Sequence, residues 1–231
     1  MVTECGSADF EKVPMDNQSD SIHKKIYLVR HGQTDVNLAK ILQGGRVDAP
    51  INKTGRQQSE AFYKKYSETP FEKIYTSLLI RSIKSVHPFI SKGVPHEALP
   101  ELNEIDYGIY DGKISSDEPG GIYSQLVGKW NDGYTDLKPE GGESPKEVQG
   151  RMKKFIALIR SRKEENILVS MHGRALRILL ATMLHYDLKY MGLFTHENFG
   201  LYIVHDSGSF FTIEKFNDVS HLHEYPEPQS L

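Results

Sequence analysis

Residues 25–37 read KIYLVRHGQTDVN, and this stretch decides the fold. Its first half, 25–29, is rich in β-branched and aromatic residues, which is typical of a β-strand. The apolar run then ends at Arg30, His31 and Gly32, so a strand leads directly into polar, turn-forming residues. The same order, a short strand followed by polar or cationic side chains, occurs twice more along the chain.

Two further strands of this kind are predicted at 73–77 (KIYTS) and 166–170 (NILVS). Between the strands, apolar residues recur at helical spacing. The clearest helix start is Ser144, which is followed by Pro145 and by Glu147, the three parts of a capping box with proline at the first helical position. Strands that alternate with helices predict an α/β fold: a three-layer α/β/α arrangement with a mostly parallel central sheet and helices on both faces.

Other elements are predicted from capping residues and periodicity. Thr54 and Gln57 form a possible capping box that opens a helix reaching Tyr66. Another helical stretch is expected over 80–89 and an apolar helix over 175–184. Residues 201–205 and 209–215 are expected to pair as a hairpin.

The ends of the chain show no periodicity. Residues 1–23 and 221–231 are therefore predicted to be disordered tails around a single folded domain spanning 24–220. Within that domain, the segment 108–141 fits neither period and is rich in turn residues, which favours a short cap insertion. His221 is expected to be solvated in the C-terminal tail.

Composition excludes several classes of protein. The 231 residues carry 28 Lys and Arg against 31 Asp and Glu, a net charge of −3, which argues against a general nucleic-acid binder. No apolar run is long enough to cross a bilayer, and the N-terminus lacks the features of a secretory signal. Cys5 is the only cysteine, so an intramolecular disulfide is excluded. These features predict a cytoplasmic protein with neither nucleic acid nor membrane as a partner.

The polar residues after the three predicted strands are expected to meet, because the carboxyl ends of parallel strands lie at one edge of a sheet. Arg30 and His31 follow the first strand, Arg81 follows the second, and His172 with Gly173 follows the third. Two histidines and two arginines in one pocket favour an anion, and phosphate is the obvious one.

The absence of several known motifs restricts the kinds of catalysis that the sequence can support. The chain contains no H-E-x-x-H, no Walker-A lysine pattern and no G-x-S-x-G, so neither a metal nor another cofactor is expected. A phosphoryl group held by arginines leaves histidine as the natural nucleophile. Neutral imidazole attacks phosphorus in line, while flanking arginines favour the neutral ring and take up charge on the equatorial oxygens.

An ordered set of motifs resembles the histidine phosphatase superfamily, the phosphoglycerate-mutase-like enzymes, and within it the phosphatase-type branch. The motifs are LVRHGQTDVN at 28–37, Gln43-Gly44, a D-x-P-[LI]-[NT]-x-x-G-x-x-Q run at 48–58, Ser77 to Arg81, ELNEIDYG at 101–108, Gly142-Glu143-Ser144 and His172-Gly173. The likeness covers nearly the whole chain outside the predicted tails. It implies a phosphohistidine enzyme that works without a metal.

By this resemblance, His31 is the phosphoacceptor, and Arg30, Arg81 and His172 complete the phosphate pocket. Further contacts with phosphate or substrate are implied at Asn37, Gln43, Gly44 and Gly173. Two departures from the family pattern stand out: Ser85 replaces a common threonine, and the bulky Arg174 is expected to influence substrate choice.

The resemblance also implies a general acid. Glu104 matches the family glutamate, with Glu101 and Asp106 as the alternatives. The remaining histidines, among them His196, show no partner spacing and are expected to be structural.

Three functions are weighed. The first is a cofactor-independent phosphatase acting on a small phosphomonoester, its partner being a small phosphorylated metabolite. The second is a phosphoglycerate mutase, and the third is a non-catalytic member that binds phosphorylated ligands. The predicted cap carries more acids than lysines, which favours the phosphatase, because an acidic lid repels a second phosphate. The oligomeric state stays open.

Overall fold

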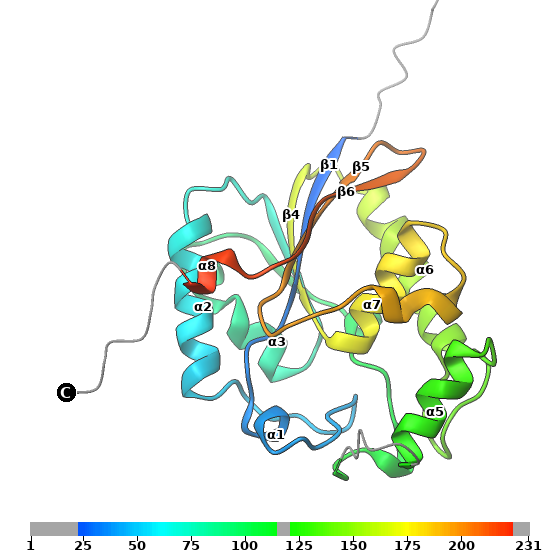
Figure 1. Cartoon of the computed structure of the whole chain (residues 1–231). Coiled ribbons are helices and arrows are strands. Elements are labelled where there is room, and N and C mark those ends of the chain that lie inside the picture. Colours follow the sequence, from blue (N-terminus) through cyan, green and yellow to red (C-terminus); the bar gives the residue numbers. More distant parts are fainter. Residues whose placement is uncertain (1–22, 115–120, 224–231) are drawn as a thin grey trace, which may run out of the picture.

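The computed structural model describes residues 23–114 and 121–223. Its centre is a six-stranded sheet in the order β3-β2-β4-β1-β5-β6 (Figure 1). The strands are β1 (Lys24–Arg30), β2 (Lys73–Thr76), β3 (His96–Ala98), β4 (Asn166–Met171), β5 (Leu201–Asp206) and β6 (Phe211–Asp218). The first four strands run parallel, whereas β5 is antiparallel to both β1 and β6. The predicted mostly parallel sheet and the predicted hairpin are confirmed.

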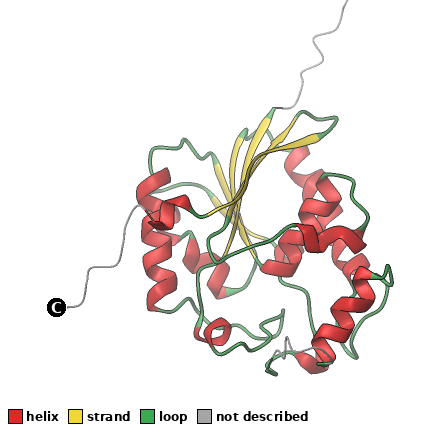
Figure 2. Cartoon of the chain, in the orientation of Figure 1, coloured by secondary structure: helices red, strands yellow, loops and turns green. Residues whose placement is uncertain are grey.

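Helices cover both faces of the sheet, which confirms the three-layer prediction (Figure 2). One face carries α2 (Lys53–Tyr66), α3 (Ile80–Ser85), α4 (His87–Ser91) and α8 (Ser220–His223). The other face carries α6 (Pro145–Ser161) and α7 (Gly173–Met183), with α5 (Ile122–Asn131) beside them. The short α1 (Asp35–Leu38) and the 3₁₀ turns η1 (Pro100–Leu102), η2 (Gly108–Tyr110) and η3 (Leu188–Leu193) complete the set. None of the helices in the described ranges has the length and hydropathy needed to cross a bilayer.

Each face of the sheet has its own hydrophobic core, and β1 contributes side chains to both cores. Ile26 and Leu28 belong to the core under α6 and α7, whereas Tyr27 and Val29 belong to the core under α2. This alternation follows from the two-residue period of a strand. The apolar run of β1 shows no helical periodicity because its side chains are buried on both faces of the sheet.

The start of α2 differs from the prediction. Its N-cap is Asn52, whose side-chain oxygen accepts a hydrogen bond from the Gly55 N–H at 2.9 Å, so Thr54 is not the cap. The Asn52 amide also donates to the Gln33 side chain at 3.0 Å. Gln33 lies in the loop that follows β1, and its hydrogen bond holds the Asn52 side chain at the start of the helix.

The helix predicted over 80–89 is divided in two. α3 ends at Ser85, and α4 begins at His87 on the other side of Val86. Pro88 has no N–H to donate to a carbonyl of the preceding turn, so a continuous helix would lose a hydrogen bond here. The helix is therefore broken by Pro88, which a prediction from apolar periodicity alone does not take into account.

The C-terminal part of the predicted domain also extends further than expected. α8 packs against α2, and His221 is fully buried, with its ring centroid 5.3 Å from that of Phe62. The prediction of a solvated His221 is wrong, because an aromatic surface more than a hundred residues away covers it. Of the tails predicted at 1–23 and 221–231, residues 1–22 and 224–231 lie outside the described residues.

The segment predicted as a cap contains a helix that the sequence analysis missed. Leu126 and Trp130 lie four residues apart on α5 and are both buried in the core that includes α6 and α7. The Trp130 indole N–H donates to the Leu137 carbonyl at 2.8 Å, which ties the helix to the following loop. Their spacing was the signal for α5 within a stretch otherwise rich in turn residues.

Ser144 caps α6 as predicted. Its hydroxyl accepts from the Glu147 N–H at 3.2 Å, and the Glu147 carboxylate accepts from the Ser144 N–H at 2.8 Å. We expect Ser144→Ala to lower the free energy of unfolding by about 1 kcal/mol, because an N-terminal N–H loses its acceptor. Denaturant titration measures the change. Ser161→Ala, at the exposed end of the same helix, should change it by less than about 0.5 kcal/mol; equal losses would contradict the capping role.

Candidate active site

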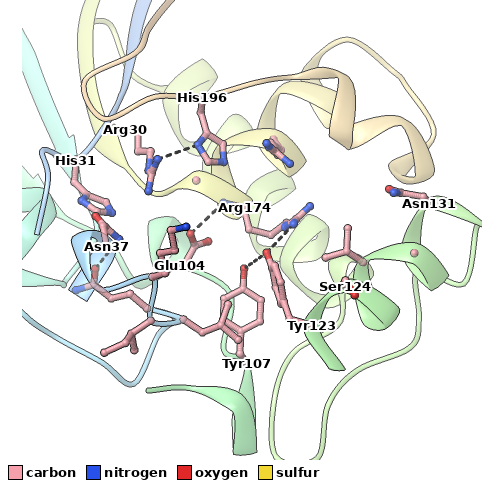
Figure 3. Close-up of a pocket in the computed structure, with 18 residues that line it drawn as sticks. Arg30, His31, Asn37, Glu104, Tyr107, Tyr123, Ser124, Asn131, Arg174 and His196 are labelled. Atoms are coloured by element: carbon pink, nitrogen blue, oxygen red, sulfur yellow. Dashed lines mark hydrogen bonds between the residues drawn. The ribbon is translucent and has the colours of Figure 1, made fainter. Parts of the chain in front are cut away.

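A cavity of about 600 Å³ lies at the carboxyl end of β1 and the start of α7, with α5 along one side (Figure 3). Its wall includes Arg30, His31, Glu104, Gly173, Arg174 and His196. These residues come from four segments that are far apart in the sequence. The cavity lies at the sheet edge where the strand-end rule predicts a site.

The protonation of His31 follows from its hydrogen bond. Its Nδ1 lies 2.8 Å from the Gly32 carbonyl oxygen, which can only accept, so Nδ1 carries the proton of the neutral ring and Nε2 carries the lone pair. Burial lowers the pKa of His31 well below its usual value, and the charges of Arg81 and Arg30 lower it further. His31 is therefore a neutral imidazole on the cavity wall with an unprotonated Nε2.

The backbone around His31 is tightly held. The His31 N–H donates to the Met171 carbonyl at 2.9 Å, and the Gly32 N–H donates to the Ser85 hydroxyl at 2.8 Å. A side chain at Gly32 would place its Cβ 2.8 Å from the Gly55 carbonyl oxygen, so only glycine fits. Ser85 thus supplies the hydroxyl that the family pattern places here as threonine.

His172 lies beside His31, with ring centroids 5.2 Å apart, but both of its nitrogens have protein partners. Arg81 Nε donates to Nδ1 at 3.1 Å, so Nε2 carries the proton and donates to the Ser77 hydroxyl at 2.7 Å. Burial, followed by the charge of Arg81, lowers the pKa of His172 well below its usual value. His172 is fully buried and lies behind the cavity wall.

Arg81 is also fully buried behind the wall. Its Nη atoms donate to the carbonyl oxygens of Val47 at 2.7 Å, Gly44 at 3.1 Å and Gln43 at 3.3 Å. Burial lowers the pKa of Arg81 to about 10. The structure therefore brings the four predicted groups together, but only Arg30 and His31 face the cavity, while Arg81 and His172 form a layer behind them.

Glu104 is the one of the three candidate acids that lines the cavity. Its Oε1 accepts from the Ala175 N–H at 2.8 Å, and its Oε2 accepts from the Arg174 N–H at 3.0 Å. The first turn of α7 thus holds the carboxyl group in place. Asp106 instead accepts from the Gly108 N–H at 2.7 Å and from the Arg46 side chain at 2.8 Å.

The other predicted contacts divide into two groups. Asn37 and Gln43 line the cavity and are joined at 3.1 Å, with the Asn37 amide donating to the Gln43 oxygen. Gly44 does not line it, and its N–H donates to the Asp111 carboxylate at 2.6 Å. Gly173 lines the cavity, and a Cβ there would lie 2.6 Å from the His196 ring.

His196 is the site histidine that sequence reasoning missed. Its Nδ1 lies 3.2 Å from Nη1 of Arg30, which can only donate, so that nitrogen is unprotonated (Figure 3). Burial, then Arg30, lowers the pKa of His196 to about 2. No local spacing signals this role, because His196 reaches the site from the loop before β5.

Four buried donor nitrogens on the wall have no hydrogen-bond partner among the residues that the structure describes. They are Arg30 Nε, Gln43 Nε2, Arg174 Nη1 and Arg177 Nε. An unpaired buried donor costs free energy, and three of these four belong to guanidinium groups, which favour carboxylate or phosphate oxygens. The wall can therefore bind an anionic ligand.

A metal site needs several ligating side chains close together. Within residues 23–114 and 121–223, no three His, Cys, Asp or Glu side chains are grouped to hold a metal ion. That the reaction here requires no metal stays a prediction.

The lowered pKa values of His31, His172 and His196 predict a pH response. The three rings should stay neutral from pH 7 down to about pH 5, where a free histidine is protonated. Nitrogen-15 NMR of the imidazoles measures this, with single His→Asn variants for assignment. Because the unfolded chain binds protons that the folded chain does not, the free energy of unfolding should fall as the pH decreases below about 6.5. A His31 signal that titrates near its ordinary pKa would contradict the assignment.

Comparison with known proteins identifies the family. The model of the histidine phosphatase superfamily (branch 1) matches residues 26–219. The 2,3-bisphosphoglycerate-dependent phosphoglycerate mutase of Rhizobium johnstonii is 30% identical over 167 residues, covering 68% of this chain and 78% of that protein.

Two other similar proteins extend the comparison. Fructose-2,6-bisphosphatase TIGAR B of Danio rerio is 29% identical over 154 residues, which is 64% of this chain and only 56% of that protein. The solved structure of Bacillus stearothermophilus YhfR superposes with a TM-score of 0.75 at 26% identity, covering 86% of this chain and 99% of that chain. The chain belongs to the histidine phosphatase superfamily, branch 1.

Proposed function

We propose that this protein is a phosphatase that hydrolyses a small phosphomonoester through a phosphohistidine at His31, with no metal or other cofactor. The observation that carries the proposal is the state of His31: Nδ1 is bonded to the Gly32 carbonyl, and the lone pair of Nε2 is left for attack. The unpaired guanidinium donors on the same wall supply the charge that a phosphoryl group requires. Phosphatases among the relatives, such as fructose-2,6-bisphosphatase TIGAR B of Danio rerio, support the same reaction.

In the first proposed step, Nε2 of His31 attacks phosphorus and the bond from phosphorus to the ester oxygen breaks. Glu104 protonates the departing oxygen, so the leaving group departs as an alcohol. Arg30 and Gln43 take up charge on the equatorial oxygens through their unpaired donors.

In the second proposed step, Glu104 accepts a proton from water, and the oxygen of that water attacks phosphorus. The bond from phosphorus to Nε2 breaks, which releases inorganic phosphate and restores His31. Arg81 and His172 are assigned a supporting role behind the nucleophile. Direct contact of His172 with phosphate would require its Nε2 to leave the Ser77 hydroxyl.

A mutase is the second candidate, because relatives about 30% identical carry that name. The charge of the cap does not exclude it. No acidic residue of the described part of the cap lines the cavity, and Asp111 is engaged by the Gly44 N–H. The expected repulsion of a second phosphate by an acidic lid is therefore not supported by the positions of these side chains.

The phosphatase and mutase reactions are separated by product analysis with 3-phosphoglycerate, with and without 2,3-bisphosphoglycerate. We expect inorganic phosphate to be released without stimulation by the bisphosphate. Conversion to 2-phosphoglycerate faster than phosphate release would establish the mutase instead. A protein that binds inorganic phosphate yet hydrolyses no ester, including 4-nitrophenyl phosphate, would be the non-catalytic binding member.

His31→Asn should lower kcat by at least about a thousandfold, because no other group takes the place of a covalent nucleophile. The exposed His87 on α4 provides the matched control, and His87→Asn should retain turnover. Mass spectrometry under alkaline conditions, after rapid quenching of the wild type, should find the phosphoryl group on His31. Substantial turnover by His31→Asn would reject the nucleophile.

Glu104→Gln should slow the reaction most for esters whose leaving group must be protonated as it departs. We expect a loss of about 10²–10⁴ in kcat/KM for an alkyl phosphate and a much smaller loss for 4-nitrophenyl phosphate, whose leaving group departs as an anion. Glu101→Gln is the control, since Glu101 does not line the cavity. Equal losses for both esters would assign the proton to another group.

A further inference from the structure

The cavity carries a second cationic group away from His31. Arg174 and Arg177 both lie in the first half of α7 and both line the wall. In Figure 3 the Arg174 side chain extends toward Tyr123 of α5, and Glu104 lies between it and His31. The two arginines therefore lie where the part of a substrate beyond the reacting phosphate would be.

Arg174 is held in place by both the cap and the core. Its Nη2 donates to the Tyr123 hydroxyl at 2.8 Å, and its guanidinium carbon lies 5.4 Å from the centroid of the Trp130 ring. Its backbone N–H donates to Glu104 at 3.0 Å. A planar guanidinium fixed in this way is organised in advance for binding a carboxylate or phosphate.

The donors that remain point to an anion. Arg174 is only 6% exposed, and its Nη1 has no hydrogen-bond partner in the described part of the chain. The same is true of Nε of Arg177. Two neighbouring cations with unpaired donors repel one another, and Arg174 contributes to lowering the pKa of Arg177 after burial does. An anionic group between them would satisfy both donors and remove that repulsion.

The size of the cavity leaves room for such a group. Its volume of about 600 Å³ lies in the range that binds whole small molecules. A phosphoryl group on His31 fills only part of it. The rest borders Arg174, Arg177 and Tyr123.

We propose that Arg174, with Arg177 and the Tyr123 hydroxyl, forms a second anion subsite, and that the preferred substrate is a phosphomonoester whose leaving group carries a carboxylate or a second phosphate. This inference rests on the proposed function, because it takes the reacting phosphate to be at His31. It names the class of substrate that the hydrolysis selects.

Matched pairs of esters test the subsite. 3-Phosphoglycerate is compared with glycerol 3-phosphate, which lacks the carboxylate, and fructose 1,6-bisphosphate with fructose 6-phosphate, which lacks the second phosphate. The readout is the ratio of kcat/KM within each pair. We expect a ratio of about 10 to 100 in at least one pair, the contribution of a charge-assisted hydrogen bond, and the pair that shows it distinguishes carboxylate from phosphate.

Variants then test whether Arg174 causes the difference in kcat/KM between the two esters of a pair. In Arg174→Gln the ratio should fall to near one, mainly through KM, and in Arg174→Lys it should be partly recovered. Arg162→Gln, which removes an exposed arginine outside the cavity, should keep the wild-type ratio. If circular dichroism shows Arg174→Gln to be unfolded, Arg177→Gln decides, with an expected fall of at least about threefold.

The outcomes separate the two proposals. Ratios near one for both pairs in the wild type would overturn the subsite and leave the hydrolysis standing. An equal loss on both members of a pair in Arg174→Gln would also overturn it, because Arg174 would then serve the reacting phosphate. Failure to hydrolyse any of these esters or 4-nitrophenyl phosphate would overturn the proposed function itself.

Discussion

The parallel pairing of β1 with β4 is the constraint on which the cavity depends. The ladder sets Arg30 opposite Met171, and the His31 N–H extends it by donating to the Met171 carbonyl. Because the two strands end in register, His31 and His172 leave the sheet at the same level and their rings lie 5.2 Å apart. A shift of one residue in β1 would exchange the faces of its side chains and separate the two rings.

Behind this edge, one buried charge organises the electrostatics. Arg81 has no exposed surface, and the cost of burying its charge is offset by carbonyl oxygens and by Nδ1 of His172. With a pKa lowered only to about 10, Arg81 stays charged at neutral pH and disfavours protonation of both neighbouring imidazoles. The site therefore combines neutral histidines with permanent positive charge, which suits the nucleophilic role that we propose for His31.

Local sequence was sufficient for the strands, the alternation with helices and the capping box at Ser144, because strand propensity, periodicity and capping act over a few residues. The strand-end rule extended this to the meeting of Arg30, His31, Arg81 and His172 at one edge. Family motifs then named Glu104 among three nearby acids. What these arguments predicted is the order of the elements and the neighbourhood of the site.

Only the tertiary structure decided which groups face the cavity. Arg81 turns its donors to backbone carbonyls while Arg174 keeps one unpaired on the wall, and His196 reaches Arg30 from a distant loop. His221, unremarkable in the sequence, is buried because α2 presents an aromatic surface to it. The sequence by itself determined the order of the main strands and the meeting of the strand-end residues, since both follow from short-range patterns. Burial and hydrogen-bond partners depend on segments that folding alone brings together, so only the tertiary structure decided which side chains face the cavity and which lie behind it.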